Sequence, residues 1–504
     1  MILPPLCALA SSLALFWLFW LLTRDERISA VAVLTIFGCG TLMAGQGIAR
    51  HVLNLNYLIP QWISNRVAPT SLYHLPFLRL YQPAVAFPLF FVFCGLVWLA
   101  LTRSTRRTAI VAATGAGFVL ALLIFSYFYL WTAAAAWLAC VCVLWLVLRR
   151  SERRQAAVVS GVIFVFGAMA LVLYFRMLSH RAATVDAAQA LVFTHRSDLF
   201  RLPEIAVLLV LALLAFGVWR GVLRGRDPVV LMAAAFALSV LAVFNQQVIT
   251  GRSLQPIHYQ WFIANYCALT ALVLTASLWW RSRVPRGLPR NRLALIAGAS
   301  LLLAFGEVWL AASVSFDYNR QIDESIPVTN RLVELARTDG VMAGSAPVVL
   351  MADLKLADRL PTDAPQSVLW APRLLVFPGV SEAENRERFF SQLYYLGYTD
   401  KKYWAELDHA DWNFLAGLFP YHRLSPAVSG SEAPITPGEL RGQLGSYLDY
   451  VHSFNRARAA APMLSYLVVH ADSHPDYANL DRWYQRDAGE RIGGFVLYRL
   501  KLRE

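Results

Sequence analysis

The side chains best suited to chemistry in the first 314 residues are concentrated in one stretch, residues 244 to 261. It reads Phe-Asn-Gln-Gln-Val-Ile-Thr-Gly-Arg-Ser-Leu-Gln-Pro-Ile-His-Tyr-Gln-Trp and lies between two long apolar runs. Amides donate and accept hydrogen bonds, arginine holds a phosphate or carboxylate through two parallel bonds, and histidine titrates near neutral pH. These residue types suit a sugar or a polar headgroup. The predicted substrate ligands are Asn245, Gln246, Gln247, Arg252, Gln255 and His258.

A purely structural role would explain the same residues without any ligand. A short loop that dips into the surface of a membrane must satisfy its own polar groups, because the surrounding hydrocarbon offers no partners. In that interpretation the amides, including Gln260, bond to one another and to the backbone. Both interpretations stay open at the level of the sequence.

Transfer chemistry at such a site would need a general base, and the first 314 residues hold only eight acids. Asp186 and Asp198, in or beside the connection 176–203, are the predicted catalytic acids. Residues 194–198 (Thr-His-Arg-Ser-Asp) have the types needed for proton transfer and phosphate binding. Their spacing matches no motif, so a solvated loop is the simpler explanation for them.

Glu307 is an acid of a different kind, because it lies inside the last apolar run. An ionisable residue within a membrane span is a functional candidate by default, and Arg252 or Arg201 is its predicted partner. A structural Arg–Glu pair between two spans is the alternative.

Long apolar helices must position these residues, because 58% of the chain is hydrophobic and only 15% is charged. A span needs about 20 residues to cross about 30 Å of hydrocarbon. The sequence therefore predicts an α-helical polytopic membrane domain over residues 1–314 with about ten transmembrane helices. Tyr127, Tyr129 and Trp131 mark a hairpin turn inside the long run 108–148. The predicted spans lie near residues 4–22, 28–45, 84–102, 108–128, 130–148, 156–175, 204–219, 229–244, 262–280 and 293–314.

Arginines give the predicted helices an orientation. Residues 1–314 contain 25 arginines and no lysine, and 17 of these arginines fall in the short connections after the first, third, fifth, seventh and ninth runs. The positive-inside rule places those connections on the cytoplasmic side of a bacterial-type inner membrane. The N-terminus, the segments 46–83, 176–203 and 245–261, and the C-terminal part are then extracytoplasmic. The net charge of +13 thus reflects topology, and no nucleic-acid partner is expected.

From about Ser315 the composition is that of a small extracytoplasmic, or periplasmic, α/β domain, residues 315–504. Predicted strands alternate with helices that begin after Ser381 and at Thr436, the second reaching about Arg458. The strands are 348–353, 367–371, 466–470 and 495–499.

The chemistry expected of this second domain is modest. Asp353 and Asp472 follow strands, where open sheets place ligand groups, but caps and turns explain them better. His470, Asp472 and His474 could chelate a metal, although a solvated turn is the simpler explanation. No cofactor, metal or disulfide framework is predicted.

With its predicted spans, its aromatic outer loops, the loop 245–259 and a trailing outer α/β domain, the chain resembles bacterial multi-pass proteins related to glycosyltransferases of the C-type membrane fold. Those enzymes take a sugar from a polyprenyl-phosphate donor at the outer face of the membrane. The resemblance implies that Arg252 and His258 lie near a lipid-linked phosphate and that the amides contact sugar hydroxyls.

One departure from that family concerns the first outer loop, where its members keep an essential Asp or Glu. Here the segment 46–83 has no carboxylate, and the chain starts on the outside, without the features of a signal peptide. Either a catalytic portion precedes this start, or the chain has no such activity.

Two functional hypotheses follow. The first is a membrane glycosyltransferase-like protein that binds membrane lipid, including a polyprenyl-phosphate sugar. The second is a non-catalytic subunit or scaffold that holds membrane-protein partners through residues 1–314 and a periplasmic partner through residues 315–504. A transporter is less well supported, because the sequence shows no convincing internal repeat.

Overall fold

The computed structural model describes the chain except for residues 1–2, 52–82, 182–191, 254, 284–288, 339–346, 378, 409–411, 425–434 and 474. The residues form two compact units. The first combines Met1–His180 with Phe193–Val314, and the second contains Ser315–Glu504.

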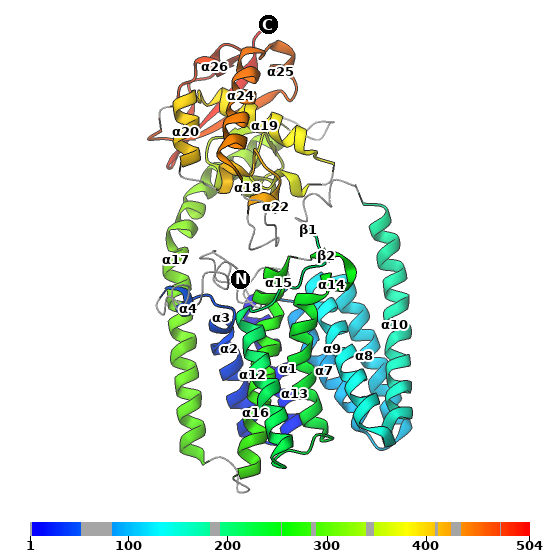
Figure 1. The fold of residues 1–504 in the computed structure, drawn as a ribbon. Helices are drawn as coiled ribbons and strands as arrows, with labels where there is room; N and C mark the ends of the chain where they lie inside the picture. Colours follow the sequence, from blue (N-terminus) through cyan, green and yellow to red (C-terminus); the bar gives the residue numbers. More distant parts are fainter. Residues whose placement is uncertain are drawn as a thin grey trace. The chain divides into compact units, whose positions relative to one another are not determined.

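The first unit is a bundle of long helices (Figure 1). Eight helices of the described residues are long and apolar enough to cross a membrane, and the apolar helix α7 is shorter. The prediction of a helical membrane domain is confirmed at this level, while the number of ten spans remains a prediction. The long helices are α1 (Leu3–Thr23), α2 (Glu26–Gly38), α7 (Phe87–Thr102), α8 (Arg106–Ser126), α9 (Phe128–Leu148), α10 (Arg153–Ser179), α12 (Leu202–Trp219), α13 (Pro228–Asn245), α16 (Asn265–Arg283) and α17 (Arg290–Thr338).

Local chemistry sets several of the helix ends. Asp25 caps α2 by accepting from two backbone N–H groups, and Asp227 caps α13 just before Pro228. Tyr127 adopts an extended conformation between α8 and α9, so the predicted hairpin turn is present.

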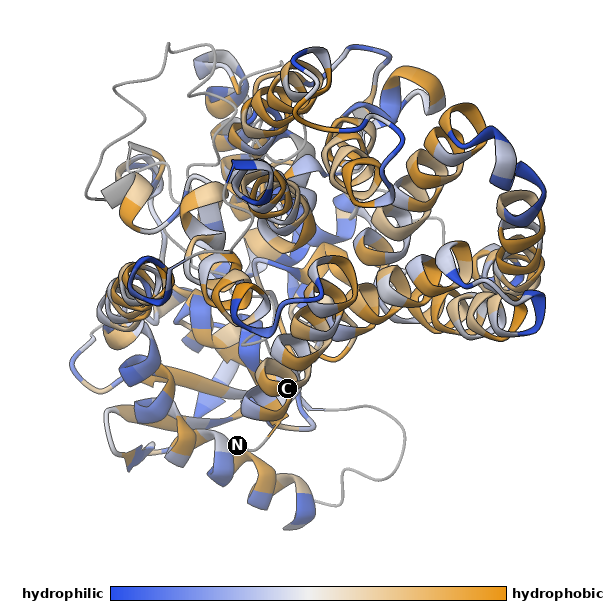
Figure 2. Ribbon diagram, turned by 90° about the horizontal axis from the view of Figure 1, so that it is seen from below, coloured by the Kyte–Doolittle hydropathy of each residue, from blue (hydrophilic) through white to orange (hydrophobic). Residues whose placement is uncertain are grey.

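The outward faces of the bundle are apolar. Phe164 of α10 is 72% exposed and Leu302 of α17 is 75% exposed. Seen from below, the helices of the bundle are coloured mainly hydrophobic, and several connections between them are coloured hydrophilic (Figure 2). Large exposed apolar surface of this extent is expected of helices that face lipid.

Hydrogen bonds join the arginine-rich connections to one another at one end of the bundle. Arg149 donates to the carbonyl of Arg226 at 2.7 Å, and Arg281 donates to the carbonyl of Thr23. Gln155 donates to the carbonyl of Arg103 at 3.0 Å. The short helices α3 (Gly40–Met43), α4 (Ile48–His51), α14 (Gln247–Thr250) and α15 (Pro256–Tyr259) lie at the other end (Figure 1).

The second unit is built on a six-stranded mixed sheet with the order β4-β3-β5-β8-β6, in which β7 also pairs with β8. Strand β3 is parallel to β4 and β5, and β8 is antiparallel to its neighbours. A partly parallel sheet was predicted. The strands are β3 (Val348–Met351), β4 (Ser367–Val368), β5 (Leu464–His470), β6 (Tyr484–Arg486), β7 (Glu490–Ile492) and β8 (Phe495–Leu502).

Successive side chains of each strand enter two different cores, as the pleat requires. Leu350 enters an aromatic core under α19 (Glu382–Tyr395) and α24 (Pro437–His452). Val349 enters an aliphatic core with α18 (Leu354–Asp363) and the end of α17. Helices on both faces of the sheet explain why its central strands are apolar throughout.

The predicted elements of this unit need two corrections. The helix that begins at Thr436 ends at His452 rather than near Arg458, and Asn455 caps a separate short helix, α25 (Arg456–Ala460). The predicted strand 367–371 is only two residues long.

Candidate functional site

A buried arginine organises the polar residues at the end of the bundle where α13 finishes. Arg201 is only 2% exposed. Its guanidinium donates to Asp198 at 2.8 Å and to Gln260 at 2.8 Å, and it lies over the ring of Phe244. Asp198, a predicted catalytic acid, is therefore engaged in an ion pair.

Glu204 and Asn245 extend this cluster. Glu204 is fully buried at the start of α12, where one carboxylate oxygen accepts from the Arg201 backbone N–H at 3.0 Å. The other oxygen accepts from the Asn245 amide at 2.9 Å. The Asn245 carbonyl oxygen in turn accepts from the backbone of Asp198 at 3.0 Å. Asn245 thus links two acids that are close in sequence to Arg201.

Two buried amides connect the cluster to the segment that follows α2. Gln260, in the π-helical turn η2 (Gln260–Ala264), donates to the carbonyl of Ala44 at 2.8 Å. Asn265 donates to the carbonyl of Gly40 at 2.9 Å. Residues 40–44 therefore depend on side chains more than 200 positions away for part of their hydrogen bonding.

Gln246 and Gln247 close the turn that follows α13. Gln246 donates to the carbonyl of Arg252 at 2.7 Å and accepts from Thr250. Gln247 donates to the carbonyl of Arg196 at 3.1 Å. These contacts let β2 (Arg252–Ser253) pair with β1 (Val192–Phe193).

Arg252 itself is exposed. Its guanidinium lies 5.5 Å from the centroid of the Phe193 ring. Within the described part of the chain it has no carboxylate partner.

The last two predicted ligands contact tyrosines of α9 and the turn before it. Gln255 has a positive φ of 48° and accepts from the Tyr129 hydroxyl at 3.0 Å. The His258 ring packs 4.6 Å from the Tyr129 ring, and its Nδ1 lies 3.5 Å from the Tyr127 hydroxyl. The six predicted ligands thus fall into three sets of contacts, and each set contains hydrogen bonds that a structural role requires.

Glu307 forms a second candidate site, at the contact of α17 with the segment after α2. It is 4% exposed, and Oε1 accepts from the Ile48 backbone N–H at 3.2 Å. Oε2 has no hydrogen-bond partner among the described residues, although the Thr41 hydroxyl lies nearby. The predicted partners, Arg252 and Arg201, were wrong for this residue, because the Ile48 amide reaches its carboxylate.

A cavity of about 350 Å³ adjoins this carboxylate. Residues of α1, α2, α3 and α17 line it, and the lining is apolar except for Ser12, Thr41 and Glu307. Gly47 leaves room for the acid, since a Cβ there would lie 1.7 Å from Oε2. A buried carboxylate in the lining of a mostly apolar cavity of ligand size is an arrangement that can bind a hydroxyl group or exchange a proton.

Neither a protein-family model nor a curated protein matches the chain. The candidate chemistry therefore depends on the geometry and on the resemblance of the loop 245–259. Asp186, the other predicted catalytic acid, lies outside the described residues, so its role stays a prediction.

In the second unit Asp353 caps α18, as the simpler interpretation predicted. Its carboxylate accepts from the backbone N–H of Lys355 at 2.8 Å and lies 3.0 Å from Nε2 of His470. His474 is outside the described residues, and no group of three possible metal ligands occurs among the residues that the structure describes.

Ionisation in the second unit follows its packing. Hydrogen bonds from Arg486 lower the pKa of Asp481. Burial raises the pKa of Tyr395 and Tyr403, which lie in the aromatic core.

Sequence reasoning missed the roles of Thr41 and Asn265. The available signal was a polar residue inside an apolar run, which each of them is. That signal indicates that a partner exists but not which one, because the partners are backbone groups or atoms of a distant helix.

Proposed function

We propose that this chain is an integral membrane protein that acts on a lipid-linked sugar, in the manner of C-type-fold glycosyltransferases, with Glu307 as its acid–base residue. The observation that supports this proposal is the carboxylate of Glu307. It is buried, one oxygen accepts from the Ile48 backbone N–H, and the residue is part of the lining of a cavity of about 350 Å³.

The position of Glu307 bears on the acid that is missing from the first outer loop. The resemblance implies an acid in the first outer loop, and residues 46–83 contain none. Glu307 comes from the last helix of the first unit, yet it contacts Gly47 and Ile48 at the start of that loop. A distant helix thus brings a carboxylate to Gly47 and Ile48, and in this proposal it takes the part of the acid that the resemblance implies.

The proposed step is a transfer with general-base assistance. The carboxylate of Glu307 accepts the proton of an acceptor hydroxyl, whose oxygen forms a bond to the anomeric carbon of the sugar. The bond from that carbon to the phosphate oxygen breaks, and the polyprenyl phosphate leaves with the electron pair. Arg252 is proposed to bind a lipid-linked phosphate, because its guanidinium is exposed and has no carboxylate partner among the described residues.

The test is consumption of a labelled polyprenyl-phosphate hexose by the purified protein in a lipid extract that supplies acceptors. We expect Glu307→Gln to lower the rate by about 100-fold or more, because it cannot accept the proton. Glu324→Gln is the matched control, since Glu324 lies on the same helix and is exposed in a surface ion pair with Arg320.

A binding measurement separates loss of chemistry from loss of the site. Ala304 lines the cavity, and Ala304→Phe should reduce retention of the labelled lipid, whereas Glu307→Gln should retain it. Turnover by Glu307→Gln equal to that of the parent would refute the role of this acid. Absence of both turnover and lipid retention in the parent protein would remove the proposed function altogether.

A specific observation favours the second candidate, a non-catalytic membrane subunit. The side chains of Asn245, Gln246 and Gln247 all bond within the chain, as a scaffold would require. Purification in mild detergent distinguishes the two candidates. A membrane protein that co-purifies in a fixed stoichiometry, without bound polyprenyl lipid, would favour the subunit.

A further inference from the structure

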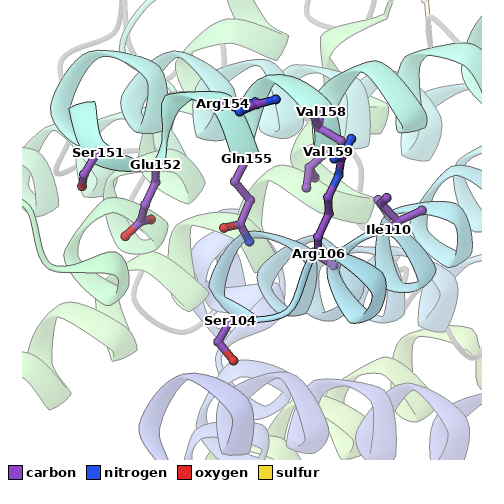
Figure 3. Close-up of a pocket in the computed structure, with 11 residues that line it drawn as sticks. Ser104, Arg106, Ile110, Ser151, Glu152, Arg154, Gln155, Val158 and Val159 are labelled. Carbon is purple, nitrogen blue, oxygen red and sulfur yellow. The ribbon is translucent and has the colours of Figure 1, made fainter.

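A second cavity of about 350 Å³ lies at the arginine-rich end of the bundle, between the first turns of α8 and α10 (Figure 3). Its lining includes the apolar side chains of Ile110, Val158 and Val159. Two arginines, Arg106 and Arg154, also line it. The cavity therefore presents cationic and apolar side chains together.

The shape of this pocket is set by contacts within the bundle. Gln155 points from α10 toward α8 in Figure 3, and its amide donates to the carbonyls of Ala100 and Leu101 at the end of α7. Further along the same pair of helices, a Cβ on Gly117 would lie 2.9 Å from the Phe166 side chain. The two helices are thus in close contact at mid-length while a cavity remains between their first turns.

The charge of the pocket is positive. Glu152 is the single acid in its lining, and its carboxylate is already paired with Arg149 and accepts from the Trp145 indole at 3.0 Å. Arg106 extends from α8 toward α10 (Figure 3). Neither Arg106 nor Arg154 has a carboxylate partner in the part of the chain that the structure describes.

We propose that this pocket binds an anionic phospholipid, with the phosphate between Arg106 and Arg154 and the start of an acyl chain against Ile110 and Val158. Guanidinium groups bind phosphate oxygens through paired hydrogen bonds, and basic pockets between membrane helices suit anionic headgroups. The apolar surface needed for the rest of the lipid is present, because Val111 and Phe164 on the same helices are 66% and 72% exposed. This site is independent of the proposed sugar chemistry, which depends on Glu307.

Native mass spectrometry of the full chain in detergent tests the proposal, with phosphatidylglycerol as the anionic probe and phosphatidylethanolamine as the zwitterionic one. We expect preferential retention of phosphatidylglycerol. The variant Arg106→Ala with Arg154→Ala should weaken its binding by about tenfold or more, given the contribution of each basic residue. Arg220→Ala with Arg224→Ala is the matched control, because it removes equal charge from another connection of the predicted cytoplasmic end.

Two further measurements identify which molecule binds in the pocket. Val158→Trp enlarges one of the apolar lining side chains without changing charge, and it should also weaken retention of phosphatidylglycerol. Equal losses in the pocket variant and the control variant would overturn the proposal. Displacement of the lipid by inorganic phosphate, together with full binding in Val158→Trp, would assign the arginines to a free phosphate instead and would also overturn it. If the double alanine variant does not fold, the double glutamine variant takes its place with the same expectations.

Discussion

At the scale of single residues, the most constrained side chain is Arg201. It is almost completely buried, and it pairs with Asp198 and binds Gln260. Glu204 is buried beside it and accepts from its backbone. Charges removed from water in this way need all their partners, because a single deletion leaves a buried charge or polar group uncompensated.

Arg201→Ala should therefore destabilise the first unit by about 3 to 5 kcal/mol, the usual cost of breaking a buried ion pair. The measurement is the unfolding midpoint of the purified protein in mixed detergent micelles, followed by circular dichroism. Arg176→Ala serves as the control, since Arg176 is exposed at the end of α10. A change no larger than that of the control would show that the pair contributes nothing to folding.

The sequence showed which residue types could do chemistry and which stretch of the chain holds them. It did not show which atoms they bond to. Asn245 and Arg252 were singled out because polar residues between apolar runs are conspicuous. What they touch could not be predicted, since most acceptors are backbone carbonyls, which every residue has. Glu307 shows the limit clearly: charge suggested an arginine, and the structure has the Ile48 amide.

At the scale of elements, apolar length was a reliable guide. The ten predicted runs all contain helices in the structure, because apolar residues of this number and helix propensity leave the backbone few alternatives. The strands β6 and β7 were not predicted, since each is only three residues long and too short for a periodic pattern. The break of 245–264 into α14, β2, α15 and a π-helical turn has no signal in hydropathy at all.

Glycine positions on α8 and α10 give a prediction at this scale. A Cβ on Gly117 would lie 2.9 Å from the side chain of Phe166, whereas a Cβ on Gly161 would meet nothing within 4 Å. Gly117→Val and Gly161→Val change helix propensity equally. We expect the first to be less stable than the second by about 1 to 3 kcal/mol, the usual cost of overpacking.

The same detergent unfolding assay measures this difference. Because the two substitutions share their chemistry, only the contact between the helices separates them. Equal midpoints for the two variants would mean that α8 and α10 do not pack closely at Gly117.

At the scale of the whole molecule, the contacts between helix connections agree with the grouping of the arginines in the sequence. Contacts such as Arg149 with Arg226 and Gln155 with Arg103 join the arginine-rich connections at one end of the bundle. The polar cluster around Arg201 joins the alternate connections. Which end faces the cytoplasm follows from the positive-inside rule alone and is a prediction.

Cysteine labelling in intact cells tests that orientation. Ile249 is 88% exposed in the connection after α13, and Ser282 is exposed at the end of α16. In a cysteine-free background, a membrane-impermeant maleimide should label Ile249→Cys directly and Ser282→Cys only after permeabilisation. The reverse pattern would invert the topology and move the Glu307 cavity to the cytoplasmic half of the bundle.

The contact between Glu307 and Ile48 spans 259 positions of the chain. At a synthesis rate of about 5 to 20 residues per second, Glu307 is made roughly 10 to 50 s after Ile48. Until then Ile48 and its neighbours lack the carboxylate that completes their hydrogen bonding. The segment after α2 therefore completes its hydrogen bonding only once α17 has been made, and nascent chains halted before Glu307 should be the ones that cellular quality control removes.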